Sequence, residues 1–503
     1  MIKRVYSCGC YGLRPFLIHA EVDVRRGVPD FDVLGGAGCY EREAAKRVRI
    51  AMKNGNYDFP KTHITVNLAP ADMPKNCSAI DLALAVGIYA HMYEVPEDRL
   101  ESFVLIGELS LDGRIKSCRN AISMVEYCLR ETNKHIVIPG ENARETYLMA
   151  CERLHYANTL SEALGCVVNG IESEPKQEIK TEIVENKALD YRDIYGNQEA
   201  KNAMMVAAAG RHHSLLIGSP GCGKTMVAER LPTIMPPMSI EEMFETTGIY
   251  SAAGKLDQQG GWISSRPVVK VSSNATPSAM TGGGRVPKPG AISLAHNGIL
   301  FVDEAIQLSP ECLDTLREPL EQGTVNISRQ NTRVIFPAGC LCVMAANPCK
   351  CGKLLDDPNL CTCSPRERGL YMKKLSGPLM DRIDLHVKMT TQPPEKMREG
   401  YSMSSQEMRE KVILACNKQE KRFGTRNRFN SQMTPGEVNQ HCILESETSR
   451  LYDMAVSKYG LSNRAYFRML RVARTLADLD DCENIGTGHI LGALSYRGIN
   501  ING

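Results

Sequence analysis

Hydrophobic and polar residues along the N-terminal third of the chain follow short patterns of two kinds. Residues 20–24 and 63–68 alternate with a period of two, which predicts half-buried strands. Residues 41–54 are rich in helix formers, and residues 80–92 are an apolar run of helical length, so we expect two helices there. The pattern predicts a first domain, residues 1–171, in which strands and helices alternate.

The pattern changes twice after this domain. Residues 172–188 are mostly charged and polar, which is typical of a solvated linker. Residues 189–390 again alternate strand runs with helical patterns, which predicts an α/β domain. Residues 391–503 carry mainly helical patterns, for example at 407–421, so the last domain is predicted to be helical.

A glycine-rich loop between a strand and a helix is the strongest chemical signal in the sequence. The strand run 214–217 leads into the loop and a helical pattern, 226–231, follows it, as the phosphate-loop motif G-x-x-x-x-G-K-[ST] requires. In such loops backbone N–H groups surround phosphate oxygens, the lysine reaches the β- and γ-phosphates, and the hydroxyl binds Mg²⁺. The alternative is a chance glycine-rich turn. The loop residues are Gly218, Ser219, Pro220, Gly221, Cys222, Gly223, Lys224 and Thr225.

Two later strand runs end in polar residues that suit the same site. The apolar run 298–302 ends at Asp303 and Glu304, which we expect to hold Mg²⁺ through water and to deprotonate the attacking water, respectively. The run 340–346 ends at Asn347, whose amide is suited to bond the attacking water or the γ-phosphate. An ordinary Asn-Pro turn is the alternative at this position. The sequence therefore predicts an ATP site that uses Mg²⁺.

Composition places the chain among ordinary globular proteins. Its 503 residues are 43% hydrophobic and 23% charged, and 60 basic against 58 acidic residues leave a net charge of +2. This balance gives no overall signal for nucleic acid, so any such surface is a local patch. No apolar run is long enough to cross a bilayer, and the N-terminus lacks a signal-peptide core, so we expect a cytoplasmic protein.

Four of the 19 cysteines stand apart by their spacing, C-x-C-x₉-C-x-C. They are Cys349, Cys351, Cys361 and Cys363, in an insert with few apolar residues. Four thiolates on a short loop suit tetrahedral Zn²⁺ in a closed structural site, although the usual C-x-x-C knuckle is absent. Free buried thiols and a redox pair are the alternatives, the second being unfavourable in a reducing cytosol.

These motifs occur together with several longer strings in an order that resembles a known family. The chain resembles the magnesium-chelatase-like AAA+ ATPases of bacteria, of the YifB/ComM type, over nearly its whole length. The resemblance implies an AAA+ P-loop NTPase α/β core with a helical C-terminal lid, and the same cysteine pairs occur in the family. Besides the phosphate loop, the matching strings lie at residues 67–75, 289–298, 302–305, 345–349, 376–386 and 461–466.

The resemblance also implies an assembly and two further site residues. Members of the family form rings, usually hexamers, that bind ATP between neighbouring subunits. Arg382 matches the arginine finger that is supplied across the subunit boundary to the γ-phosphate. Arg464 matches the second sensor in the helical lid. A surface salt bridge is the alternative for each arginine.

The first domain resembles the S5-type α+β domain of Lon-type proteases, but it lacks their chemistry. The position of the nucleophilic serine falls on Ala79, and that of the activating lysine falls on Ile122. We therefore expect a noncatalytic domain, with a Ser78–Lys116 dyad as the alternative, since a hydroxyl without a positioned base is a poor nucleophile.

Resemblance to ComM implies a motor that drives branch migration or similar remodelling of DNA. Residues 324–337 are predicted to be a hairpin with Arg329, Gln330 and Asn331 at its tip, and residues 418–428 carry five basic side chains. Such clusters can contact phosphates, although the second stretch also fits a solvated helix end. A magnesium-chelatase-type motor and an ATPase acting on a protein partner are the alternative functions. A protease is opposed by the missing dyad, and a nonenzymatic scaffold by the intact ATP motifs.

Overall fold

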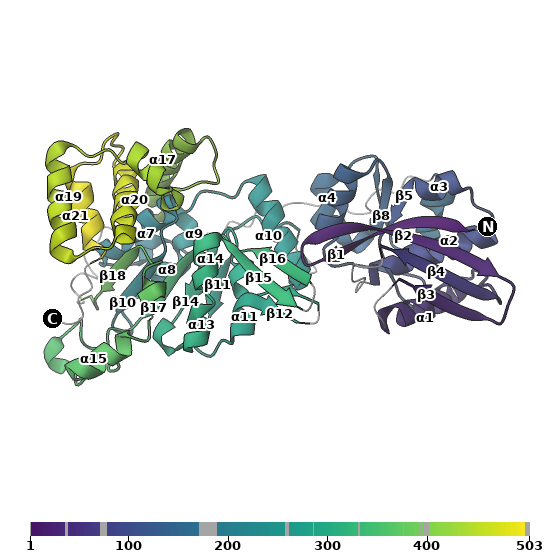
Figure 1. Ribbon diagram of the computed structural model, residues 1–503, viewed down its shortest axis with the longest axis horizontal. Coiled ribbons are helices and arrows are strands. Elements are labelled where there is room, and N and C mark those ends of the chain that lie inside the picture. The colour runs from purple at the N-terminus through teal and green to yellow at the C-terminus, as the bar shows by residue number, and fades with distance from the viewer. Residues whose placement is uncertain are drawn as a thin grey trace.

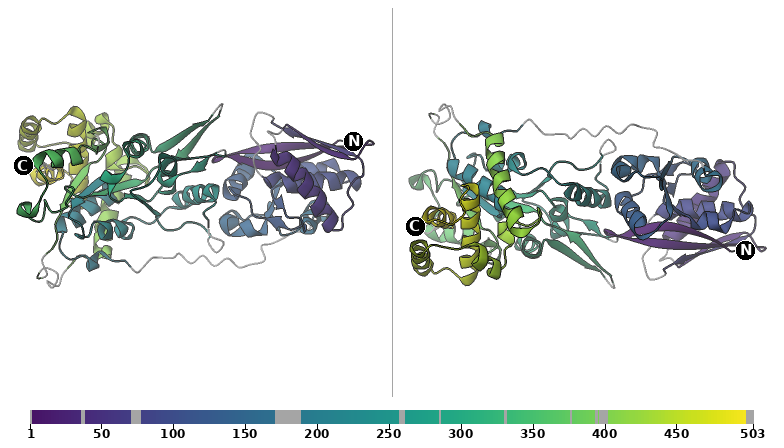
Figure 2. Two further views of the ribbon diagram at one scale, coloured as in Figure 1. Left: turned by 90° about the horizontal axis from the view of Figure 1, so that it is seen from below. Right: turned by 90° about the horizontal axis from the view of Figure 1, so that it is seen from above.

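The computed structural model shows an elongated molecule with a large sheet at its N-terminal end and a group of helices at the other (Figure 1). Both views in Figure 2 show the same separation. None of the described helices is long and apolar enough to cross a membrane. The predicted linker, residues 172–188, lies outside the described residues. The structure describes residues 2–35, 39–70, 78–170, 189–256, 261–284, 286–329, 332–375, 377–392, 395 and 402–497.

The N-terminal domain is built on a seven-stranded sheet of order β3-β4-β2-β1-β5-β8-β9. Helix α2 (Asp81–Met92) is apolar nearly all round and almost completely buried, as expected of a helix inside a core. Helices α1 (Cys39–Asn54) and α4 (Ala121–Glu131) also belong to this domain. The predicted strands and helices of this segment are confirmed. The strands are β1 (Lys3–Tyr11), β2 (Arg14–Arg25), β3 (Asp30–Leu34), β4 (His63–Ala69), β5 (Phe103–Leu105), β8 (His135–Pro139) and β9 (Leu154–Ala157).

The two positions that the expected protease resemblance makes equivalent to catalytic residues are both buried. Ala79 is 2% exposed and Ile122 is fully buried. Lys116 lies in the two-residue strand β7 (Ile115–Lys116) with its side chain exposed. The side chain of Ser78 is outside the described part of the structure. An alanine and an isoleucine supply neither a nucleophile nor a base at these two positions.

The second sheet is five-stranded and parallel, with the order β11-β14-β17-β10-β18. Every residue of its three central strands is buried, as expected when helices cover both faces of a parallel sheet. Since neighbouring strands run in the same direction, their carboxyl ends meet at one edge, where ligands of open α/β sheets bind. The strands are β10 (Ser214–Gly218), β11 (Val268–Val271), β14 (Ile299–Val302), β17 (Leu341–Ala346) and β18 (Leu385–Met389).

The C-terminal helices pack against this sheet through polar contacts as well as a shared core. Helix α7 (Gln198–Gly210) contacts β18 and two of the C-terminal helices. Just after α7, buried His212 bonds Asp384 at 2.9 Å and Thr475 at 2.9 Å, which joins the sheet to α20. The C-terminal group of helices is therefore joined to the core. Its helices are α17 (Ser405–Phe423), α18 (Pro435–His441), α19 (Ser446–Tyr459), α20 (Asn463–Leu479) and α21 (Thr487–Ser495).

The N-terminal domain meets the second sheet's domain through apolar packing of Tyr11 and Leu13 and through hydrogen bonds. The backbone N–H of Asn120 donates to Ser251 Oγ on helix α10 (Ile240–Ala253) at 2.9 Å. The Nε1–H of Trp262 donates to the carbonyl oxygen of Glu145 at 2.8 Å. The chain has one tryptophan, so its fluorescence reports on this interface.

We expect the stability of Glu145→Gln, relative to that of the wild type, to increase as pH rises. Burial raises the pKa of the Glu145 carboxyl from 4.5 to about 7, although a hydrogen bond from Asn142 opposes the shift. Between these pH values the unfolded chain has lost a proton that the folded protein keeps, so the wild type loses stability as pH rises from about 4.5 to 7. The loss is on the order of 3 kcal/mol. Glutamine removes this dependence.

Urea unfolding followed by the fluorescence of Trp262, at several pH values between 5 and 8, measures the effect. The matched control is Glu152→Gln, whose side chain is exposed in the same domain. A difference between wild type and Glu145→Gln that stays constant across this pH range contradicts the prediction.

Candidate functional site

The glycine-rich loop occupies the carboxyl end of β10, next to the centre of the second sheet, and leads into helix α8 (Lys224–Glu229). Gly221 and Gly223 have φ angles of 82° and 94°, a conformation that side-chain-bearing residues rarely adopt. A Cβ atom at either glycine would have no neighbour within 4 Å. The loop is therefore open beside both glycines, and its backbone conformation, rather than crowding, requires them.

Lys224 links the loop to the neighbouring strand. Its Nζ donates to the carbonyl oxygens of Gly218 at 2.7 Å and Ser219 at 2.9 Å, and to Asn347 Oδ1 at 3.2 Å. Burial lowers the pKa of this half-buried ammonium group, while Asp303 and Glu304 are among the charges that oppose the shift. The structure thus brings the predicted lysine and the predicted asparagine into direct contact.

The acidic pair lies beside the same loop. Asp303 Oδ2 is 3.5 Å from Thr225 Oγ1, so a hydroxyl and a carboxylate, both suitable oxygen ligands for Mg²⁺, face each other. Glu304 has a φ of 48°, and its backbone N–H donates to Asp303 Oδ1 at 3.0 Å. Left-handed backbone at a non-glycine residue concentrates at functional sites. The side chain of Glu304 is exposed, as access to a water molecule requires.

Arg382 and Arg464 meet at a different place. Arg382 donates to Glu321 and, at 2.7 Å, to the carbonyl oxygen of Pro378. Arg464 donates to the other carboxylate oxygen of Glu321 at 2.8 Å. Both arginines line a cavity of about 1040 Å³ between the second sheet's domain and the C-terminal helices, and no residue of the glycine-rich loop lines it. Within one chain, both arginines therefore form salt bridges with Glu321, as the alternative interpretation of each arginine expects.

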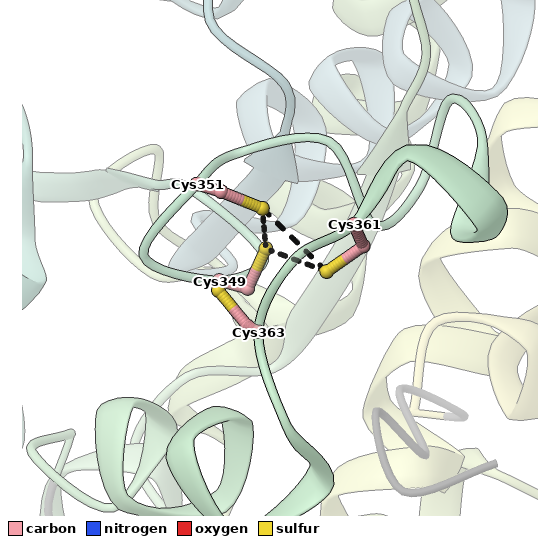
Figure 3. A group of neighbouring side chains, drawn as sticks. All are labelled: Cys349, Cys351, Cys361 and Cys363. Atoms are coloured by element: carbon pink, nitrogen blue, oxygen red, sulfur yellow. Dashed lines mark hydrogen bonds between the residues drawn. The ribbon is translucent and has the colours of Figure 1, made fainter.

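The four predicted cysteines converge (Figure 3). The sulfurs of Cys349, Cys351 and Cys361 are 3.4, 3.5 and 3.6 Å apart in pairs, and all four sulfurs lie within 4.8 Å of one another. A tetrahedral ion with about 2.3 Å bonds to sulfur places its ligands about 3.8 Å apart. The residues therefore fit Zn²⁺, and none of the four forms a disulfide.

The two basic stretches differ in what they offer a nucleic acid. The predicted hairpin is confirmed as β15 (Thr324–Arg329) and β16 (Thr332–Pro337), while its tip residues Gln330 and Asn331 lie outside the described residues. In the stretch 418–428, Lys418, Arg422, Arg426 and Arg428 all form ion pairs. Because acids neutralise four of its five basic side chains, this stretch fits the solvated helix end better than a phosphate-binding cluster.

Three charged residues near these sites belong to no motif that the sequence shows. Lys270 on β11 pairs with Asp303 at 3.3 Å, Glu321 holds both arginines, and Asp356 lies in the four-cysteine loop. Lys270 lies on a different strand from the one that leads to Asp303, far from it in the sequence. Glu321 and Asp356 each have another acidic residue close by in the sequence. No local motif distinguishes them, so only the folded arrangement reveals them.

Comparison with protein families defines the class of this chain. Residues 190–397 match the family model "Magnesium chelatase, subunit ChlI", and residues 402–497 match "Magnesium chelatase, subunit ChlI C-terminal". Residues 20–142 match "Subunit ChlI of Mg-chelatase". Together with the phosphate loop and the parallel sheet, these matches place the chain in the class of AAA+-type ATPases.

Individual relatives narrow this class. The chain is 35% identical to an uncharacterized protein YifB of Salmonella typhimurium, covering 98% of this chain and 97% of the relative. It is 36% identical to competence protein ComM of Haemophilus influenzae, over the same shares. The magnesium-chelatase 38 kDa subunit of Cereibacter sphaeroides is 23% identical, over 62% of this chain and 92% of the relative. The chain belongs to the magnesium-chelatase-like family of the YifB/ComM type.

Proposed function

We propose that this protein is an ATP-hydrolysing ring motor in which each active site is completed by two subunits. The observation that carries the proposal is the convergence of Lys224, Asn347, Thr225 and Asp303 at one sheet edge. Arg382 and Arg464 form a second, separate group around Glu321. A positive group that does not reach its own phosphate loop suits the loop of a neighbouring subunit, as in other nucleotide hydrolases with an arginine supplied in trans.

Each residue of the site has a role that follows from its position. Lys224 binds the β- and γ-phosphate oxygens, and the backbone N–H groups of residues 218–225 surround the phosphates. Thr225 and Asp303 hold Mg²⁺, Asp303 acting through water, and the ion neutralises charge that develops on the transferred phosphoryl group. Glu304 orients and deprotonates the attacking water, while Asn347 positions that water or the γ-phosphate. Arg382 and Arg464 of the neighbour stabilise the same charge.

The four-cysteine cluster is proposed to hold a structural Zn²⁺. Its sulfur-to-sulfur distances match a four-thiolate site, and four protein ligands leave no open position for catalysis. Backbone N–H groups of Lys353 and Thr362 face the sulfur of Cys351, and that of Lys353 contributes most to lowering the pKa of this thiol, whereas burial raises the pKa of Cys349 beside it. Such N–H groups stabilise a thiolate, which is the form that binds metal.

We propose that the motor acts on DNA. The relative named competence protein ComM covers the whole length of the chain, whereas the magnesium-chelatase relative covers 62% of it. The hairpin β15–β16 carries Arg333, whose side chain is exposed. Two guanidinium nitrogens of Arg333 donate hydrogen bonds to Asn326 Oδ1 on the other strand, which keeps the arginine side chain along the hairpin.

DNA is therefore expected to stimulate ATP hydrolysis, with forked or single-stranded DNA more effective than duplex. The measurement is the ATPase rate with and without each DNA, at about 50 and 200 mM salt, since phosphate contacts weaken steeply with salt. Arg333→Ala should reduce the stimulation and leave the DNA-independent rate unchanged, and Arg130→Ala in the N-terminal domain is the control. An ATPase that no DNA stimulates or binds at low salt contradicts the DNA proposal and leaves the ATPase proposal standing.

A further inference from the structure

The four-cysteine loop is in direct contact with the phosphate loop. Gly352, between the two cysteine pairs, is buried and has a φ of 79°. A Cβ atom at this glycine would lie 2.6 Å from Cδ of Pro220, which belongs to the phosphate loop. The backbone of one loop therefore packs against the other so closely that only glycine fits.

The same loop carries Asp356, whose carboxylate binds the chain just after strand β18. One oxygen accepts the backbone N–H of Thr391 at 2.9 Å, and the other accepts the Thr391 hydroxyl at 2.8 Å. Strand β18 lies beside β10, the strand that leads into the phosphate loop. Lys224 is among the positive groups that act on Asp356.

Further hydrogen bonds lead from this point back to the phosphate loop. The residues on either side of Thr391 both donate to the side-chain oxygen of Asn197: the Thr390 N–H at 3.4 Å and the Gln392 Nε2 at 3.3 Å. Asn197 in turn donates from Nδ2 to the carbonyl oxygen of Cys222 at 3.2 Å. The cysteine loop thus supports the phosphate loop twice, by packing on Pro220 and through the route from Asp356 to Cys222.

Little else in the cysteine loop holds it in place. Of the three leucines between the two cysteine pairs, Leu355 packs, partly buried, against the core of the second sheet, whereas Leu360 is exposed. A metal ion held by Cys349, Cys351, Cys361 and Cys363 cross-links both ends of this loop, which removes much of its conformational freedom. Cys349 is fully buried and follows Asn347 by two residues, so the cross-link begins next to the ATP site.

We propose that Asp356 is a positioning residue of the ATP site and that metal binding by the four thiolates fixes the loop that carries it. Metal occupancy therefore sets the affinity for ATP. This inference rests on the proposed function, because it requires that residues 218–225 bind ATP. Asp356 acts through Thr391 and Asn197 and through the Ser219 hydroxyl of the phosphate loop, which also stabilises its carboxylate, and none of these groups is a reacting atom.

The test measures binding of a fluorescent ATP analogue to full-length protein, first loaded with zinc and then depleted with a chelator. Loaded wild type should hold about one zinc per chain, by the four-thiolate argument. Zinc removal should weaken nucleotide binding about tenfold, the effect expected from losing one or two hydrogen bonds to a charged group. Asp356→Ala should cause a similar loss in the loaded protein, and zinc removal should add little to it. Asp357→Ala, which removes the same charge from the next residue, should change the affinity less than about twofold.

The outcomes separate this inference from the function on which it rests. Well-folded, loaded wild type that shows no saturable binding contradicts the ATP site itself. A chain that takes up no zinc overturns the inference together with the proposed zinc site, and leaves the ATP site standing. Tight ATP binding that zinc removal does not change overturns the inference alone. The same holds if Asp356→Ala and Asp357→Ala behave alike. Fluorescence of Trp262 and circular dichroism verify the fold of each variant, and Thr391→Val, which removes one partner of Asp356, should give an intermediate loss.

Discussion

Lys224→Ala is expected to abolish ATP binding at micromolar nucleotide, with a loss in kcat/KM of at least about 100-fold, because the variant loses charged hydrogen bonds to two phosphates. In the structure this ammonium group already bonds three oxygens around the place where phosphate would lie, those of Gly218, Ser219 and Asn347. Alanine cannot replace any of these contacts. The measurements are titration with a fluorescent ATP analogue and the steady-state rate of phosphate release.

Glu304→Gln provides the comparison that separates binding from chemistry. Its amide keeps the size of the side chain but cannot accept a proton, so this variant should bind ATP with an affinity close to that of the wild type and hydrolyse it slowly. Lys270→Ala is a weaker perturbation that removes the ion pair to Asp303 and leaves the loop intact. Turnover by Lys224→Ala at the wild-type rate would remove residues 218–225 from the active site.

The phosphate-loop side of the site could be predicted because its geometry is local. A strand, a glycine-rich turn and a helix in succession place Lys224 and Thr225 without any knowledge of the rest of the fold. The sequence could also predict that Asp303 and Asn347 lie near the loop, since each follows a buried strand and parallel strands end at one edge of the sheet. The sheet order then shows why they approach the loop: β17 lies between β10 and β14.

The pairing of charges could not be predicted in the same way. The sequence shows five basic residues in 418–428 as one cluster, yet two of them pair with Asp478 and Asp481, at the end of a different helix. Arg382 and Arg464 are 82 residues apart in the numbering and meet only because Glu321 lies between the sheet and the lid. Such contacts depend on tertiary packing, which no local pattern encodes.

The convergence of the two arginines on Glu321 has a consequence for assembly. In one subunit this single carboxylate pairs with both guanidinium groups and so leaves one positive charge uncompensated, and Arg382 has little exposed surface, about 15% of its side chain. A phosphate from a neighbouring subunit would compete with Glu321 for the same donors. Since a triphosphate carries more negative charge and more acceptor oxygens than a carboxylate, it is the stronger partner for two arginines.

Arg382→Ala is therefore expected to lower the ATPase rate of the assembled protein about 1000-fold, the effect expected from losing an arginine finger, while ATP binding changes little. A subunit-mixing experiment distinguishes this role from a structural one. Lys224→Ala and Arg382→Ala are each nearly inactive alone, because every subunit boundary lacks one half of the site. In a mixture, boundaries form in which Arg382→Ala supplies an intact phosphate loop and Lys224→Ala supplies an intact arginine. Equal amounts should recover about a quarter of the wild-type rate if subunits mix at random.

Recovery on mixing is a result that neither misfolding nor an ATP site contained within one subunit can produce. Arg317→Ala is the control, since Arg317 lies on the same helix as Glu321, α14 (Arg317–Gln322), and pairs with Asp314 instead. This variant should keep the wild-type rate. A mixture that remains as inactive as its components, although both variants exchange subunits, would place Arg382 in the salt bridge with Glu321 and nowhere else. That result would leave the phosphate loop to work without a charge from its neighbour.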